Sequence, residues 1–187
     1  MRRASTTLAL LVALAPVLRG DTRAQLASAA RAQVGVTRSY DPSYVPLRYP
    51  GGDVPMERGV CSDVVIRAFR QVGVDLQVAV HEDMKAHFRA YPQMWGLRGP
   101  DRNIDHRRVP NLMRFFERKG RSLARSARYE PGDIVAWRLP NNLHHIGVVS
   151  DVRNATGTDY LVVHNIGSGA LNEDVLRSWM IIGHYRW

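Results

Sequence analysis

The first half of the chain carries apolar residues at helical spacing. From Cys61 to Val72, apolar side chains recur at the intervals i, i+3, i+4 and i+7, and Gly59 and Gly73 flank the segment. This pattern predicts a helix that starts at Cys61. Weaker patterns of the same kind predict three further helices, over 25–34, 77–90 and Pro110 to Gly120. Four prolines within residues 36–58 exclude a regular helix there and predict an extended or turn-rich segment.

The pattern changes to short apolar runs after Pro131. These runs are separated by polar turns and predict four strands, over 133–139, 146–152, 160–164 and 181–186. Helices first and strands afterwards are typical of an α+β fold, so we expect N-terminal helices packed on a C-terminal antiparallel sheet. The chain has no internal repeat and no linker, which predicts a single domain over residues 25–187.

Composition narrows the classes of protein that fit. The chain has 187 residues, of which 45% are hydrophobic and 23% are charged, and these values fit one soluble globular domain. The formal charge of +9 would suit nucleic acid, anionic lipid or an anionic polymer such as bacterial cell wall. Because the basic residues are scattered and no zinc-finger spacing, RNA-binding aromatic signature or leucine heptad accompanies them, we expect no nucleic-acid partner. We also expect a monomer.

The N-terminus has the layout of a secretory signal peptide. Arg2-Arg3 precedes an apolar run over Thr6–Leu18, which is shorter than the about 20 apolar residues that cross a bilayer. We therefore expect residues 1–24 to be a signal peptide and the protein to be secreted or periplasmic, with cleavage near Ala24 or Gly20. No cysteine follows the run, which excludes a lipoprotein anchor and predicts no stable membrane anchor. The alternative is an uncleaved membrane anchor.

Cys61 is the only cysteine. An exported protein with one cysteine has no internal disulfide, so its thiol is paired between molecules, buried and inert, or reactive. A helix N-terminus lowers a thiol pKa through its free N–H groups and its dipole, which favours a reactive role. However, a free cysteine commonly packs as a small hydrophobic residue, and Cys61 shares the apolar face of its predicted helix. The helix alone leaves both roles open.

Two histidine positions supply the partners that a nucleophilic thiol needs. His144 and His145 stand at the start of a predicted strand, and alternation along a strand points them to opposite faces, so only one can meet Cys61. The next strand ends in His164-Asn165. In a hairpin, either His164 or Asn165 could orient the base and fix its tautomer.

The order of these motifs resembles that of a known group of enzymes. Cys61 at a helix start is followed by Gly132-Asp133 before an apolar strand, then by His145–Val149, and then by His164. This order resembles the NlpC-type and CHAP-type cell-wall peptidases and amidases, which have a papain-like fold. The resemblance implies that Cys61 is the nucleophile, that His145 is the general base and that His164 orients it, with no cofactor and no metal.

A closer resemblance is to the bacterial family called domain of unknown function 1287, which has no settled activity. It covers nearly all of residues 36–187 and is carried by five stretches: Gly59–Asp63, His81–Met84, Tyr91-Pro92, Pro100–Asn111 and His164–Gly167. The chain departs from the NlpC pattern in two ways. Val60 stands where an aspartate usually precedes the cysteine. Residues 73–130 form a family-specific insertion that lengthens the gap between Cys61 and His145 and is expected to reshape the substrate groove.

Two further stretches are candidates for substrate binding. Residues 101–108 hold two carboxylates, a histidine and three arginines, and arginine pairs bidentately with carboxylates such as those of peptidoglycan stem peptides. The candidates in this stretch are Asp101, Asp105, His106 and Arg107. The alternative is a loop held together by its own Asp–Arg pairs. Tyr49 precedes Gly51-Gly52 and resembles the aromatic–Gly–Gly stretch upstream of the NlpC cysteine, so its hydroxyl is a candidate donor to an oxyanion.

Three functions compete at this point. The first is a secreted cysteine hydrolase that cuts an amide or peptide bond in peptidoglycan. The second is a non-catalytic module that binds the cell wall. The third is a metal-dependent hydrolase, although no HExxH-type spacing supports it. Its candidate ligands are His81, Asp83, His106, His144 and His145.

Overall fold

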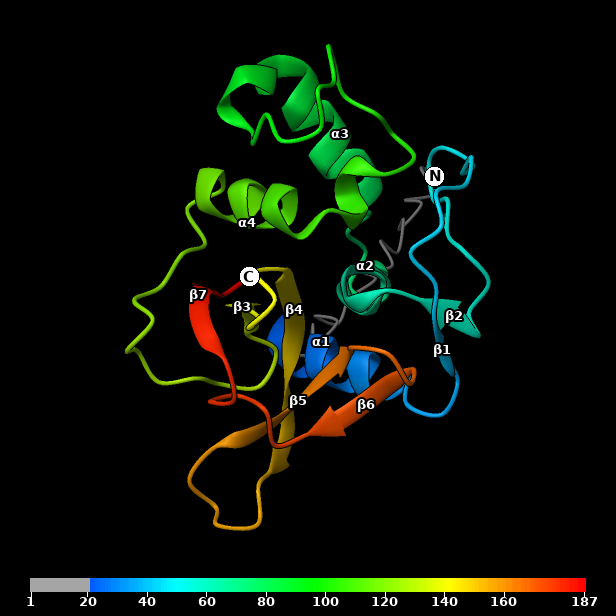
Figure 1. Ribbon diagram of the computed structural model, residues 1–187. Coiled ribbons are helices and arrows are strands. Elements are labelled where there is room, and N and C mark those ends of the chain that lie inside the picture. Colours follow the sequence, from blue (N-terminus) through cyan, green and yellow to red (C-terminus); the bar gives the residue numbers. More distant parts are fainter. Residues whose placement is uncertain (1–20) are drawn as a thin grey trace, which may run out of the picture.

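The computed structural model describes residues 21–187. Its main sheet has five antiparallel strands (Figure 1). The sheet order is β6-β5-β4-β3-β7, and each neighbouring pair is antiparallel. Its strands are β3 (Ile134–Arg138), β4 (His144–Arg153), β5 (Tyr160–Asn165), β6 (Ala170–Glu173) and β7 (Met180–Tyr185). The predicted α+β class with a C-terminal antiparallel sheet is confirmed.

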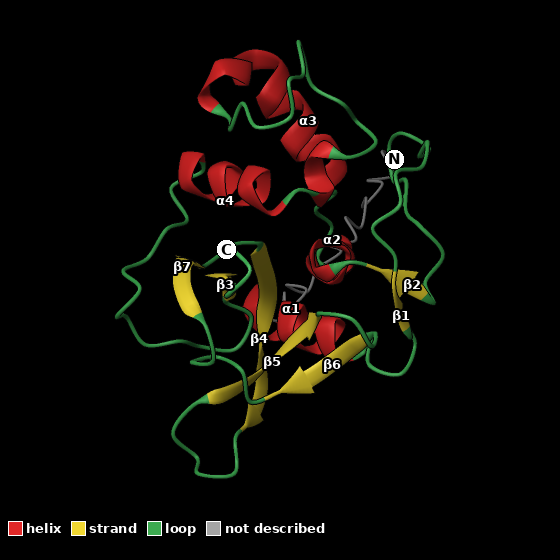
Figure 2. Cartoon of the chain, viewed as in Figure 1, coloured by secondary structure: helices red, strands yellow, loops and turns green. Residues whose placement is uncertain are grey.

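Four α-helices lie within the described residues, together with two short 3₁₀ helices (Figure 2). They are α1 (Thr22–Arg31), α2 (Cys61–Gln71), α3 (Leu76–His87), η1 (Phe88–Ala90), η2 (Asp105–Arg107) and α4 (Val109–Arg118). Helices α1 and α2 pack against each other and against β4. The α2 helix begins at Cys61 and ends at Gln71, as the apolar spacing predicts.

The two faces of the sheet bury different residues. Ile146 and Val148 of β4 belong to the core that α1, α2 and α4 cover. Val149 of the same strand belongs to a smaller cluster on the opposite face, together with Trp137 and Leu176. Because side chains alternate along a strand, even-numbered residues of β4 face the helices and odd-numbered residues face the smaller cluster.

The sequence pattern missed three strands. Strand β6 carries Asn172 and Glu173 and so lacks the β-branched and aromatic residues that mark a strand. The other two are only two residues long: β1 (Ser39–Tyr40) and β2 (Arg58–Gly59) form a parallel pair within the proline-rich segment. This pair returns the chain to the start of α2.

The first helix begins earlier than predicted. Its start is set by Asp21, whose carboxylate accepts a hydrogen bond from the N–H of Arg23 at 3.0 Å. The predicted signal peptide falls mostly on residues 1–20, which lie outside the described residues, but its last residues lie in this first turn. A Cβ on Gly132 would lie 2.1 Å from the carbonyl oxygen of Arg23, so this turn packs closely on the domain. No helix among residues 21–187 is long and apolar enough to cross a membrane.

Candidate active site around Cys61

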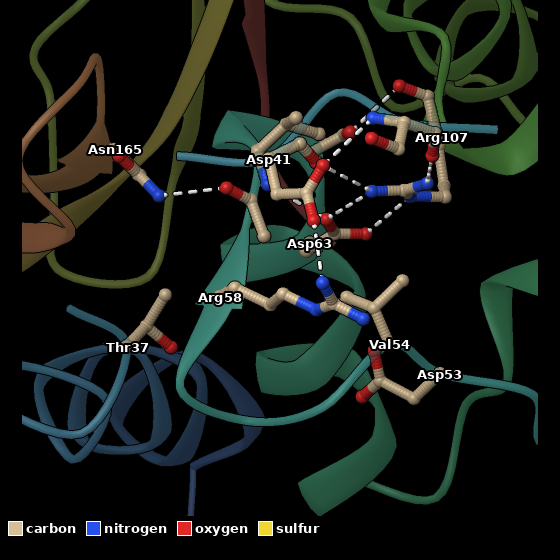
Figure 3. A network of polar contacts seen from close by, with 12 residues as sticks. Thr37, Asp41, Asp53, Val54, Arg58, Asp63, Arg107 and Asn165 are labelled. Carbon is tan, nitrogen blue, oxygen red and sulfur yellow. Dashed lines mark hydrogen bonds and ion pairs between the residues drawn. The ribbon is translucent and has the colours of Figure 1, made fainter. Parts of the chain in front are cut away.

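Cys61 is the first residue of α2 and is 4% exposed. The turn that presents it is fixed by Asp63, whose carboxylate accepts a 2.7 Å hydrogen bond from the N–H of Val60. Asp63 in turn receives two 2.9 Å hydrogen bonds from the guanidinium of Arg107, and both side chains are buried. Figure 3 shows Asp63 and Arg107 facing each other in this network. The start of α2 is therefore held by a buried ion pair.

The thiol of Cys61 is neutral at rest. Burial raises its pKa to about 12, and the nearby Asp63 carboxylate adds to this, while the backbone N–H groups of Ile146, Ser62 and Cys61 oppose it. The prediction that the helix start lowers this pKa is therefore wrong, because desolvation outweighs the N–H groups. The contact with Ile146 places the thiol against the start of β4, one residue from His145.

His145 is the first member of a chain of side-chain hydrogen bonds. Its Nε2 lies 2.9 Å from Nδ1 of His164, and Nε2 of His164 lies 3.0 Å from Oε2 of Glu173. The His145 ring stacks on Trp137 at 5.6 Å between centroids and meets Trp179 edge-on. Among residues 21–187, Nδ1 of His145 has no hydrogen-bond partner.

The rings of His145 and His164 are both neutral imidazoles at neutral pH. Burial lowers the pKa of His145 to about 3, and the neighbouring His164 lowers it further. Burial also lowers the pKa of His164, against the opposing effect of the Glu173 carboxylate. A neutral imidazole keeps one nitrogen free to accept a proton, which a general base needs.

The sequence left open which residue of the His164-Asn165 pair contacts His145. The structure brings His164 to it, whereas the Asn165 amide donates to the carbonyl oxygens of Gly59 (2.9 Å) and Ser39 (3.2 Å). Gly147 leaves space for the His164 side chain. A Cβ at Gly147 would lie 3.2 Å from Cβ of His164 and 2.9 Å from the carbonyl oxygen of Val163. Asn165 therefore ties β5 to the strand pair that precedes α2.

His144 and His145 lie on opposite faces of β4, as alternation predicts. His144 lines the same cleft as Cys61, is partly buried, and has its pKa lowered by burial and by Arg138. His145 lies with Trp137 on the other face, next to the N–H that contacts the thiol. Within residues 21–187, no hydrogen bond joins Cys61 to either histidine. The structure therefore brings His144 into the cleft with Cys61, and it brings His145 into the hydrogen-bonded series with His164.

The cleft beside Cys61 has a volume of about 400 Å³. Residues 73–130 supply much of its wall, including Met94, Trp95 and Arg108. Met94 and Leu143 both line the cleft, and each is 60% exposed, which is unusual for side chains of this size. The Arg108 guanidinium lies 4.1 Å from the centre of the Trp95 ring. The wall therefore combines exposed apolar surface with a cation, which suits a peptide.

The 101–108 stretch is held both by contacts within it and by contacts with the rest of the domain. Asp105 is buried and pairs with Arg108 at 3.1 Å, and Arg107 is bound to Asp63. His106 is buried, and burial lowers its pKa to about 4. Asp101 accepts a 3.0 Å hydrogen bond from the hydroxyl of Tyr44. Of the four predicted substrate-binding residues in this stretch, only Arg107 lines the cleft. The substrate roles of the four stay predictions.

Tyr40 lies where Tyr49 was expected. The hydroxyl of Tyr49 donates to Glu82 at 3.1 Å, and Tyr49 does not line the cleft. Tyr40 lines the cleft beside Cys61, and burial raises its pKa to about 12, with smaller effects from Cys61 and Asp63. Sequence reasoning missed Tyr40, because only the pairing of Tyr40 with Gly59 in the short β1–β2 pair brings it beside the thiol.

The five candidate metal ligands do not gather. No group of three or more His, Cys, Asp or Glu side chains that could hold a metal ion occurs among residues 21–187. Asp83, one of these candidates, instead accepts hydrogen bonds from Tyr91, Arg118 and Lys119, which links α3 to α4.

Comparison with known proteins places the chain in a family. Residues 27–187 match the family described as "Domain of unknown function (DUF1287)". The chain belongs to the DUF1287 family. It is also 57% identical over 173 residues to the uncharacterized protein YijF of Escherichia coli strain K12, an alignment that covers 91% of this chain and 84% of YijF. The DUF1287 match spans Cys61, both members of the histidine pair and the cleft wall, so the whole candidate site lies inside the family domain.

Proposed function

We propose that this DUF1287 protein is a papain-like cysteine hydrolase of the NlpC type, and that it cleaves an amide bond in peptidoglycan stem peptides outside the cytoplasm. Cys61 would be the nucleophile and His145 the general base, with His164 as the residue that orients His145. The observation that carries this proposal is the position of the thiol. The thiol lies at the N-terminus of α2 and against the backbone N–H of Ile146, the residue after His145. The ring of His145 is hydrogen-bonded to His164.

The resting charges define how the first step would proceed. Because the thiol and both imidazoles are neutral, the proton must leave Cys61 as the sulfur attacks the substrate carbonyl. Nδ1 of His145 would take this proton at the place where the thiol lies against the N–H of Ile146, the residue after His145, and the sulfur–carbon bond would form. The imidazolium would then give the proton to the leaving amine as the carbon–nitrogen bond breaks. Water would hydrolyse the resulting thioester with His145 again as base, which restores the thiol and releases a carboxylic acid.

Two groups near the thiol are candidates to donate to the developing oxyanion. The backbone N–H of Cys61 lies at the start of α2, where N–H groups have no partner within the helix. Tyr40 lines the same cleft, and the raised pKa of its hydroxyl keeps it protonated as a donor. These two groups are our candidates for the oxyanion site.

Charge and predicted export support the choice of polymer. The formal charge of the full chain is +9, and it stays positive without Arg2, Arg3 and Arg19 of the predicted signal peptide, which favours an anionic polymer such as stem peptides with their carboxylates. The predicted signal peptide would bring the protein to the compartment that holds this polymer.

Digestion of purified sacculi tests the proposal. The wild-type protein is expected to release muropeptides in the presence of EDTA, and Cys61→Ala is expected to release none. Activity that EDTA abolishes and Cys61→Ala retains would identify a metal-dependent hydrolase instead. Sacculus binding without any release would identify a wall-binding module.

A further inference from the structure

Glu173 ends the chain of contacts that starts at His145. It is the last residue of β6, directly opposite Val162 of β5, and its side chain is 42% exposed. Its carboxylate lies 3.0 Å from Nε2 of His164, and the other nitrogen of that ring lies 2.9 Å from Nε2 of His145. Three titratable groups thus share two hydrogen bonds.

The direction of these two hydrogen bonds follows from counting donors and acceptors. An ionised carboxylate only accepts, so Nε2 of His164 must carry a hydrogen. A neutral imidazole has one donor and one acceptor, so Nδ1 of His164 must accept. Nε2 of His145 must then carry a hydrogen and donate it. The lone pair of His145 is therefore left on Nδ1.

Without the carboxylate, the same two rings could bond in the opposite direction. Nδ1 of His164 would donate to Nε2 of His145, and the hydrogen of His145 would stand on Nδ1. A proton added to His164 would have the same effect, but burial lowers the pKa of that ring and opposes this. A ring with its hydrogen on Nδ1 has no lone pair there to accept a proton from a thiol.

The other neighbours of the two rings offer no competing charge. Trp179 packs edge-on against both histidines, and Trp137 stacks on His145. The indole N–H of Trp137 already donates to the carbonyl oxygen of Leu176 at 3.1 Å. Among residues 21–187, Glu173 is the charged side chain that bonds to the His145–His164 pair.

We propose that Glu173 is a positioning residue: it sets the tautomers of His164 and His145 and so leaves Nδ1 of His145 as the basic nitrogen. The catalytic consequence rests on the proposed function, but the tautomers are a property of the folded protein and are measurable without turnover.

Nitrogen-15 NMR of ring-labelled histidines tests this proposal, with His145→Gln and His164→Gln used to assign the signals. In the wild-type protein, both rings are expected to carry their hydrogen on Nε2. In Glu173→Ala, both rings are expected to shift toward the opposite tautomer, whereas Asp174→Ala, whose carboxylate contacts Asn154, is expected to leave them unchanged. Muropeptide release by Glu173→Ala should fall about tenfold or more, up to the about 100- to 10,000-fold that general-base catalysis contributes in full.

Two results would overturn the proposal. One is a wild-type His145 that carries its hydrogen on Nδ1. The other is a Glu173→Ala protein with the wild-type tautomers of both rings. If the tautomers change as expected but Cys61→Ala still releases muropeptides, then the proposed function fails and the role of Glu173 in setting the tautomers stands.

Discussion

His145 and His164 share a hydrogen bond of 2.9 Å between Nε2 of the first ring and Nδ1 of the second. This bond joins neighbouring strands on the face of the sheet that carries Trp137, whereas His144 lies in the cleft on the other face. The two adjacent histidines therefore have different surroundings, and variants of each form a matched pair that decides which one acts as base.

We expect His145→Gln to lower the rate of muropeptide release by about 100- to 10,000-fold, which is the usual contribution of a positioned general base. His144→Gln should stay within a few-fold of the wild type, because His144 contacts Arg138 and no carboxylate or second imidazole among residues 21–187 bonds to it. Steady-state rates on sacculi measure both. A loss confined to His144→Gln would assign the base to the cleft histidine.

The buried pair of Arg107 and Asp63 is predicted to stabilise the start of α2. Arg107→Met would leave the Asp63 carboxylate buried without its partner, and breaking such a pair costs about 3 kcal/mol or more of unfolding free energy. Urea denaturation measures this loss. Arg114→Met breaks an exposed pair with Glu117 and should cost far less. Equal losses in the two variants would show that the Asp63 contact does not hold the helix.

The reactivity of the thiol should depend on pH in a way that distinguishes a buried from an activated cysteine. Only the thiolate is alkylated, so the rate rises with pH up to the thiol pKa. With the pKa of Cys61 raised to about 12, the rate of iodoacetamide labelling should still be climbing above pH 9. The same protein unfolded in urea should level off above about pH 8.5. A plateau below pH 8 in the folded protein would mean that the thiolate forms at rest.

Export is predicted to leave Asp21 at the N-terminus. Asp21 caps α1, and the backbone of Arg23 packs against Gly132, so cleavage after Gly20 keeps the first turn, whereas cleavage after Ala24 removes it. Intact mass of the protein recovered from the periplasm or medium measures the cleavage point. A mature chain that begins at Gln25 would contradict this, and a protein retained at full length in the membrane would contradict export itself.

Much of the fold could be predicted because it follows local patterns. The apolar repeat and flanking glycines locate α2 within one residue, and apolar runs locate four of the five strands of the main sheet. Strand β6 escaped prediction because its pairing with β5, and not its composition, makes it a strand. Its last residue, Glu173, escaped for the same reason.

The site could be predicted only in part. Strand alternation separates His144 from His145, but it does not say which one contacts His164. The role of Arg107 was also hidden, because its partner Asp63 lies 44 residues away in the sequence. Tyr49 was chosen over Tyr40 on the glycines that follow it, whereas a two-residue strand pair decides which tyrosine reaches the thiol. Burial reversed the expected direction of the Cys61 pKa shift, and a sequence pattern does not report burial.

The most direct test of the central claim is whether substrate becomes bonded to Cys61. Wild-type protein mixed with sacculi and quenched in acid within milliseconds to seconds should show, by intact mass and peptide mapping, an acyl adduct on Cys61 that hydroxylamine removes. The Cys61→Ala protein should show no adduct and no muropeptide release. Release of muropeptides at the wild-type rate by Cys61→Ala would contradict the claim that this cysteine is the nucleophile.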